Sequence, residues 1–95
     1  MSTFILIRDD VVYREIDGEI VALSLASGEY VGFDAIGTSI WRLIEGLGSV
    51  ALVRAGLLAE FDVDEPTCEA ELNSFIETLL ARQLVTLDAT ATAAS

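Results

Sequence analysis

The 95-residue chain contains no histidine and only one cysteine, Cys68. Histidine is the commonest general base and a frequent metal ligand. Its absence removes the groups on which most acid–base catalysis and many zinc sites depend. A single cysteine cannot form an internal disulfide bond, which favours a reducing, cytoplasmic compartment. We therefore expect a protein that is not an enzyme and that needs neither a metal nor another cofactor.

Positive charge is scarce, and long apolar runs are missing. The five basic residues are all arginines, scattered along the chain among sixteen acidic residues, and the net charge is −11. Nucleic-acid binding depends on Lys and Arg side chains that neutralise phosphates, so DNA and RNA are not expected partners. No apolar stretch approaches the roughly 20 residues that span a bilayer, so no membrane contact is expected. The acidity fits a basic partner as well as it fits a merely solvated surface.

The first half of the chain predicts a three-stranded antiparallel meander. Residues 11–16 are rich in β-branched side chains. The Asp-Gly pair at 17–18 follows as a hairpin turn, because both positions tolerate a positive φ. Residues 19–25 form the return strand, and residues 29–33 form a short third strand after a second turn. Residues 4–7 are a candidate for a further strand.

The second half of the chain predicts three helices. Asp34 and Ser49 have side chains suited to N-caps, and Gly46 and Gly48 are expected to end the first helix. Pro66 fits the first turn of the third helix, where its missing N–H costs nothing. Apolar residues recur at helical spacing after each of these starts. In the third helix they are Cys68, Leu72, Phe75, Ile76, Leu79 and Leu80.

This order of elements indicates one α+β domain over residues 1–88, followed by a flexible C-terminal tail over residues 89–95. Residues 84–87 are expected to be extended. Residues 20–25 hardly alternate between apolar and polar side chains, so we expect both faces of the second strand to be covered. Cys68 lies within the apolar stripe of the third helix, which favours a small buried hydrophobe over a nucleophile.

The third strand is apolar and carries no charge in its interior, although the meander places it at an edge of the sheet. Such an edge is an aggregation hazard unless it is protected or left for a partner strand. A peptide can pair with the free N–H and C=O groups of an edge strand, and we expect the N–H of Val31 to be one of them. Gly32 suits the close approach of another backbone, but a bulge or a bend into the helix would explain it equally well.

Residues 28–46 match a sequence pattern of a known family. The positions that match are Gly37, Ile40, Trp41, Leu43, Ile44 and Gly46. Phe33 and Asp34 stand where Leu-Asn is usual. On these residues, and more generically over residues 11–87, the chain resembles the PqqD-like family. These are the leader-peptide recognition elements of ribosomal peptide (RiPP) biosynthesis, and the chain most resembles the discrete leader-binding proteins of lasso-peptide clusters.

The resemblance implies a winged-helix-like fold, with a three-stranded antiparallel β-sheet followed by three α-helices. It implies that the leader region of a precursor peptide adds a strand to the third β-strand beside the third helix. A separate maturation enzyme, such as a leader protease, would then act on the peptide; a homodimer is left open. Trp41 and most of the third-helix stripe are expected in the core. Carried onto this chain, the peptide-binding residues are Glu29, Tyr30, Val31, Gly32, Phe33, Asp34, Cys68, Leu72, Phe75, Ile76 and Leu79.

Two rival classes of protein share parts of this pattern. A winged-helix regulatory or nucleic-acid-binding protein would need a basic recognition helix, whereas the third helix carries four glutamates against Arg82 alone. A carrier protein would also be small and acidic, but it would be helical and would need a serine at a helix start after an aspartate. Ser39 is misplaced for that role, and the predicted strands argue against it.

Overall fold

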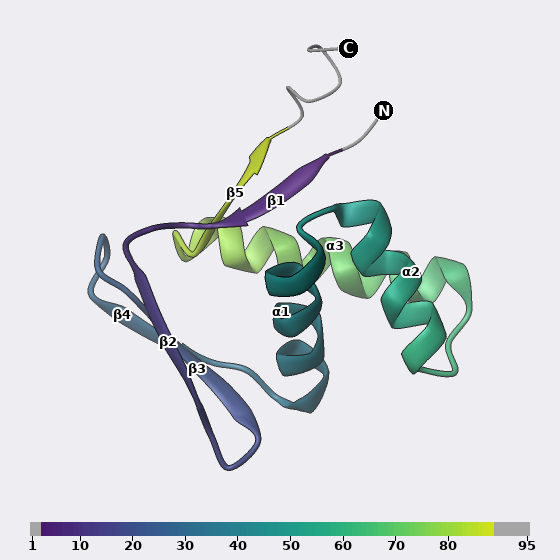
Figure 1. Cartoon of the computed structure of the whole chain (residues 1–95), viewed down its shortest axis with the longest axis horizontal. Coiled ribbons are helices and arrows are strands. Elements are labelled where there is room, and N and C mark those ends of the chain that lie inside the picture. Colours follow the sequence, from purple (N-terminus) through teal and green to yellow (C-terminus); the bar gives the residue numbers. More distant parts are fainter. Residues whose placement is uncertain (1–2, 89–95) are drawn as a thin grey trace.

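The computed structural model describes residues 3–88 and has the predicted α+β architecture (Figure 1). The tail predicted at residues 89–95 lies outside the described residues. A three-stranded sheet packs against three helices, and a two-stranded sheet stands at one end of the helical layer. The elements are β1 (Phe4–Ile7), β2 (Val11–Ile16), β3 (Glu19–Ser24), β4 (Glu29–Gly32), α1 (Ala35–Leu47), α2 (Val50–Glu60), α3 (Glu65–Ala81) and β5 (Val85–Asp88).

The main sheet has the predicted order β2-β3-β4, and both of its pairings are antiparallel. The β2–β3 hairpin turns at Asp17 and Gly18, whose φ angles are 53° and 84°. A type I′ turn requires positive φ at both central positions, and its twist matches that of the flanking strands. Two residues of local sequence therefore specify this hairpin.

β1 and β5 form a second antiparallel sheet, in which Ile5 lies opposite Leu87. Both segments were expected to be extended, but their pairing was not predicted, because it joins the two ends of the described chain. The side chains of Ile5 and Val85 are buried in the core. An isolated bridge between Phe4 and Ser49 attaches this sheet to the connection between α1 and α2.

Helices α1 and α2 begin at the predicted side-chain caps. The Asp34 carboxylate accepts the N–H of Gly37 at 2.8 Å, and Ser49 caps α2 in the same way. Gly48 ends α1 in the left-handed conformation, with a φ of 67°. Gly46 was also expected to end this helix, but it lies inside α1 because the left-handed stop comes two residues later.

A chain of four aromatic rings joins the sheet to the helices. Trp41 is fully buried, as predicted, and the ring centroids of Tyr13 and Phe33 lie 5.1 and 5.3 Å from its own. The Phe33 ring lies 5.2 Å from that of Phe75 in α3. Aromatic pairs contribute about 0.5–1.5 kcal/mol each beyond the area they bury. The Tyr13 hydroxyl donates to the Glu45 carboxylate, which raises the pKa of Tyr13.

A buried hydrogen bond attaches β3 to α1. The backbone N–H of Ile20 donates to the Thr38 hydroxyl at 3.0 Å, and both residues are buried. The carbonyl of Ile20 accepts the N–H of Phe33 at 2.9 Å. Ile20 is thus held by α1 and by Phe33, the residue that follows β4, so the sheet and the first helix cannot shift independently.

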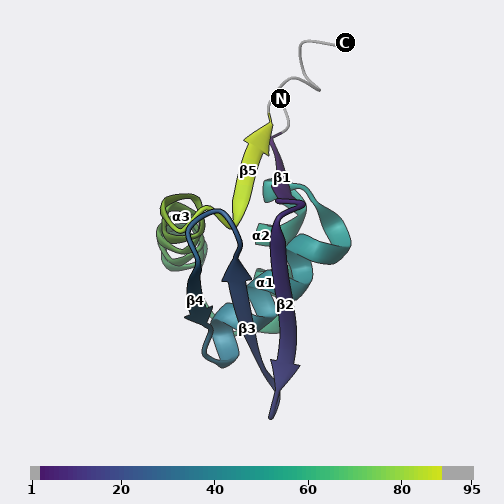
Figure 2. The ribbon, with the colours of Figure 1, turned by 90° about the vertical axis from the view of Figure 1, so that its left-hand side faces the viewer.

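The outer face of the main sheet is open, contrary to the expectation that both faces are covered. Figure 2 shows the sheet with the helices behind it and no helix of the described chain in front. On β3, Ala22 faces the helices and is buried, whereas Val21 and Leu23 face outward and are half-buried. The nearly continuous apolar pattern therefore marks an exposed apolar face and not a second covering layer.

Helix α3 turns one face into the core. Cys68, Leu72, Ile76 and Leu79 are buried, and they follow one line along the helix. The Cys68 thiol lies 3.9 Å from the Arg54 carbonyl, which confirms that this cysteine is a small buried side chain.

The substitution Thr38→Val removes the hydroxyl while nearly keeping the shape of the side chain. The N–H of Ile20 then stays buried without an acceptor, which costs about 1–3 kcal/mol. We expect the free energy of unfolding in urea to fall by that amount. Ser39→Ala is the control, because the Ser39 hydroxyl donates to Glu60 at the surface. It should stay within about 0.5 kcal/mol of wild type. Equal stability of Thr38→Val and wild type would show that this bond does not anchor β3.

The orientation of α3 is tested by truncating two leucines on the same helix. Leu72 is 1% exposed, so Leu72→Ala should lower the free energy of unfolding by about 2–5 kcal/mol. Leu80 is 38% exposed, and Leu80→Ala should cost less than half as much, because it leaves a smaller cavity. Urea denaturation measures both values. Similar losses for the two variants would mean that α3 does not bury the face described above.

Candidate peptide-binding site

β4 lies at an edge of the main sheet, as predicted, and within residues 3–88 its only strand partner is β3. The pairing is one-to-one, from Gly32 opposite Val21 to Glu29 opposite Ser24. On its other side β4 runs beside α3 (Figure 2). The backbone groups on this side are therefore placed to receive a further strand.

The direction of each backbone group in β4 follows from two hydrogen bonds. The N–H of Phe33 donates to the Ile20 carbonyl at 2.9 Å, and the N–H of Leu25 donates to the Asp10 carbonyl at 2.9 Å. In an antiparallel pair, successive residues of a strand turn their backbone groups alternately toward the partner and away from it. The even-numbered residues of β3 thus bond to β4, and the odd-numbered residues of β4 bond to β3.

The outward-facing N–H and C=O groups of β4 are therefore those of Tyr30 and Gly32. Val31 was expected to carry an outward N–H, but it lies opposite Ala22 and turns its backbone toward β3. The register of the β3–β4 pairing decides whether odd- or even-numbered residues of β4 face outward. A shift of one residue would exchange the two sets. A partner strand would meet two residues that each offer one donor and one acceptor.

The side chains of the predicted strand residues divide between the two faces of the sheet. Val31 is half-buried and Phe33 is buried, and both face the helices. Tyr30 points to the outer face and is 71% exposed. Glu29 and Asp34 are exposed at the two ends of the segment. Only Val31 and Phe33 can therefore contribute apolar surface on the side of α3.

Gly32 meets no internal requirement for glycine in this chain. Its pairing with Val21 is regular, which excludes a bulge, and its φ is not positive. A Cβ added at Gly32 would meet no atom within 4 Å. The explanations that remain are a bend of the chain toward α1 and the close approach of a partner backbone.

Of the five predicted residues in α3, the structure brings Phe75 to the groove, which is the cavity just beyond the end of β4. Phe75 is half-buried and lines a cavity between α1 and α3. Leu72, Ile76 and Leu79 belong to the core, with exposures of 6% or less. Cys68 is also buried and borders a smaller cavity nearer the start of α3. Helical spacing alone predicted the apolar stripe of α3. It could not distinguish the residues that face the core from Phe75, which faces the cavity.

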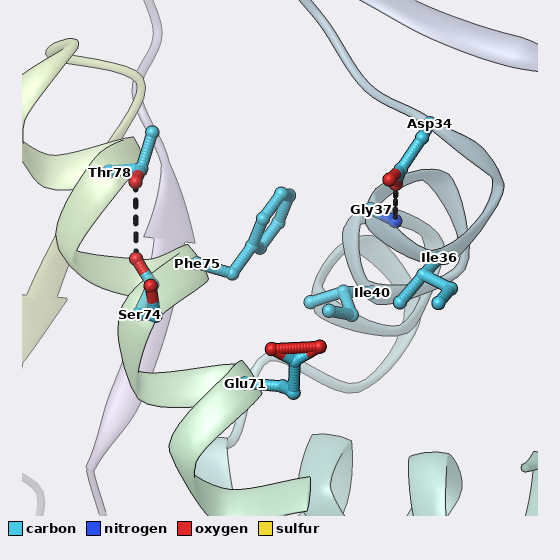
Figure 3. A pocket seen from close by; sticks show the side chains of 8 residues that line it. All are labelled: Asp34, Ile36, Gly37, Ile40, Glu71, Ser74, Phe75 and Thr78. Atoms are coloured by element: carbon cyan, nitrogen blue, oxygen red, sulfur yellow. Dashed lines mark hydrogen bonds between the residues drawn. The ribbon is translucent and has the colours of Figure 1, made fainter.

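The cavity beside the end of β4 measures about 210 Å³. Figure 3 shows α3 side chains on one wall and residues from the start of α1 on the other. Its lining combines polar and apolar side chains, so it can hold the stem of a side chain as well as a polar head. The lining residues are Asp34, Ile36, Gly37, Ile40, Glu71, Ser74, Phe75 and Thr78.

Gly37 allows α3 to approach the start of α1 closely. A Cβ added at Gly37 would lie 3.0 Å from the Phe75 ring and 3.1 Å from the Cβ of Phe33. These separations are shorter than ordinary van der Waals contacts, so a larger residue would force one of the two rings to move. The glycine that opens the recognised sequence pattern thus sets the width of the groove.

Two contacts hold α3 alongside β4. At one end, Arg82, which ends α3, forms an ion pair with Glu29 at 3.3 Å. At the other end, the Phe33 and Phe75 rings are in edge-on contact. The ion pair is exposed and contributes at most about 1 kcal/mol, so the aromatic contact is the stronger of the two.

Sequence reasoning missed six residues that line this cavity. Glu71 and Thr78 lie four residues before and three residues after Phe75, and this spacing places all three on one helix face. A helical projection centred on Phe75 would have found them. Ile36 was assigned to the apolar stripe of the first helix, yet it is 47% exposed and faces the cavity. The other three missed residues are Gly37, Ile40 and Ser74.

The site offers backbone hydrogen-bonding groups, apolar walls and negative charge. The Ser39 hydroxyl, in the middle of α1, donates to Glu60 at 3.1 Å and lies outside the cavity. Among residues 3–88, no group of three or more Cys, Asp or Glu side chains is arranged to hold a metal ion. No helix in that range has the length and apolarity of a membrane span. The arrangement suits the binding of an extended peptide.

Comparisons with known proteins agree with this geometry. The family described as "Coenzyme PQQ synthesis protein D (PqqD)" matches residues 19–85. The solved structure "TbiB1 in Complex with the TbiA(beta) Leader Peptide" is 39% identical with a TM-score of 0.80, over 84% of this chain and 93% of that chain. The structure "Lasso peptide synthetase B1 complexed with the leader peptide" is 21% identical with a TM-score of 0.76, over 86% and 96%, and shares the fold. The comparison with curated proteins found no match.

The matched segment begins with β3 and ends at the start of β5, so it includes the edge strand, all three helices and the Trp41 pattern. The resemblance drawn from that pattern is confirmed, and the chain belongs to the PqqD family.

Proposed function

We propose that this protein binds the leader region of a ribosomally made precursor peptide and presents it to a separate maturation enzyme, such as a leader protease. The observation that carries this proposal is the edge of β4, where Tyr30 and Gly32 turn their backbone groups away from β3, on the side of the sheet where α3 runs. An extended peptide adds to such an edge as a further strand. The 39% identical structure, a complex of TbiB1 with a leader peptide, supports the same class of ligand.

Backbone pairing alone is too weak to explain useful binding. Two outward-facing residues form about four hydrogen bonds, and each contributes roughly 1 kcal/mol. Micromolar affinity requires about 8 kcal/mol, and ordering a flexible peptide costs several kcal/mol more. Two or three apolar side chains of the peptide, at roughly 2 kcal/mol each, supply the difference. Val31 and Phe75 are the half-buried apolar surfaces beside the strand on which they would pack.

The role requires no catalytic group in this chain. Holding the leader on β4 raises the local concentration of the rest of the precursor near any enzyme that engages the complex. Only the leader is bound in this arrangement, so the segment beyond it stays free for the enzyme. The single cysteine fits the cytoplasmic setting in which ribosomal precursors are made.

Strand addition is tested by Gly32→Pro, which removes an outward N–H and puts a ring in the path of the partner strand. We expect the affinity for peptide to fall at least tenfold, because a hydrogen bond is lost and the peptide backbone cannot close on β4. Fluorescence anisotropy measures this. The probes are the labelled TbiA(beta) leader peptide and a peptide selected on the wild-type protein from a random display library.

Glu15→Pro is the matched control, because Glu15 lies on the opposite edge strand, where odd-numbered residues face outward by the same alternation. Both variants should keep the circular dichroism spectrum of wild type, and only Gly32→Pro should lose affinity. Equal affinity of Gly32→Pro and wild type, or failure of the wild-type protein to bind any peptide, contradicts the proposal.

A further inference from the structure

The cavity between α1 and α3 adjoins a second cavity between α1, α2 and α3. This second cavity measures about 90 Å³ and shares Ile36, Ile40 and Glu71 with the first one. Its remaining walls are mostly apolar and include Leu57, Phe61, Val63 and Cys68. Its volume is that of one aliphatic side chain, well below the size of a small-molecule site.

Two carboxylates stand over the first cavity from opposite sides. Figure 3 shows Glu71 on α3 and Asp34 at the start of α1, with Ile36, Ile40 and Phe75 between them. Asp34 uses one oxygen to cap α1. Neither carboxylate belongs to an ion pair within residues 3–88. The ion pairs there are Arg8–Asp10, Arg42–Glu15 and Arg82–Glu29.

We infer that the double cavity is a sequence-reading subsite, which takes a Lys or Arg side chain of the bound peptide between Asp34 and Glu71 and a neighbouring aliphatic side chain in the 90 Å³ cavity. This inference rests on the proposed function, because it concerns the part of the same peptide that extends beyond the strand on β4. Asp34, which lines the first cavity, lies two residues beyond the end of β4, so a peptide that leaves the strand at this end meets the cavity next.

The walls fit these two side chains in different ways. A Lys or Arg stem is apolar and packs along Ile36 and Phe75, while its charged head reaches the carboxylates at the mouth. The Phe75 ring can also face the cation, which adds attraction. The net charge of −11 strengthens the field at the groove. Backbone pairing with β4 reads no sequence, so a subsite of this kind must supply the discrimination between peptides.

The direction of the peptide follows from the sheet. All pairings in β2-β3-β4 are antiparallel, and purely antiparallel sheets are favoured over mixed ones. A peptide antiparallel to β4 runs from the Asp34 end toward Glu29. The basic and aliphatic residues therefore lie N-terminal to the segment that pairs with the strand.

A charge-reversal selection tests this inference. A display library of random peptides is selected separately on the wild-type protein, on Glu71→Lys and on the control Glu69→Lys. Glu69 lies on the same helix, is exposed, and lines neither cavity. We expect wild type and Glu69→Lys to enrich Lys or Arg beside an aliphatic residue, and Glu71→Lys to enrich Asp or Glu at the same position. The wild-type consensus peptide should bind Glu71→Lys about fivefold more weakly or worse, and this loss should shrink as salt is added.

The outcomes separate this inference from the proposed function. If peptides selected on all three proteins share one consensus but still lose affinity for Gly32→Pro, the subsite is wrong and strand addition stands. If the selected peptides carry no basic residue, the subsite is likewise wrong. If their affinity is unchanged by Gly32→Pro, strand addition itself fails.

Discussion

The contact of Phe33 with Trp41 and Phe75 is the interaction on which the groove depends. Phe33 directly follows the edge strand, and α1 begins two residues later. Its ring lies 5.3 Å from that of Trp41 and 5.2 Å from that of Phe75, so one side chain links the sheet, α1 and α3. Its N–H donates to the Ile20 carbonyl and thereby also sets which residues of β4 face outward. Phe33 therefore takes part both in the wall that separates the sheet from α3 and in the pairing that orients the backbone of β4.

Local signals predicted most of the fold because the relevant interactions lie within a few residues. The Asp17–Gly18 turn and the Asp34 and Ser49 caps each depend on neighbours along the chain. The pairing of β1 with β5 depends on residues about eighty positions apart, and neither strand carries a signal for the other. The open outer face of β3 was missed for a related reason. An apolar residue such as Val21 looks the same in a sequence whether another layer covers it or solvent does.

The sequence predicted which elements form the candidate site but not which of their residues face it. The edge strand and α3 are correct as elements of the structure, yet the outward backbone groups belong to Tyr30 and Gly32 and not to Val31. Only the register decides between odd and even residues, and the register depends on tertiary contacts. On α3, Phe75 directly precedes the buried Ile76, so their side chains point about 100° apart around the helix axis. Apolarity alone does not distinguish the two, since both are hydrophobic.

An exposed edge strand normally invites pairing with a second copy of the same chain, and the charge of this protein opposes that outcome. β2, the other edge of the sheet, carries Arg14 and Glu15 in its interior, and interior charges discourage strand pairing. β4 has no charge between Glu29 and Asp34, so it is the better template. Two copies that met at β4 would each bring a net charge of −11 to the contact, and their repulsion would oppose the pairing. A cationic peptide meets attraction at the same edge. The acidity of the chain thus disfavours pairing between two copies at this edge and favours a basic partner there.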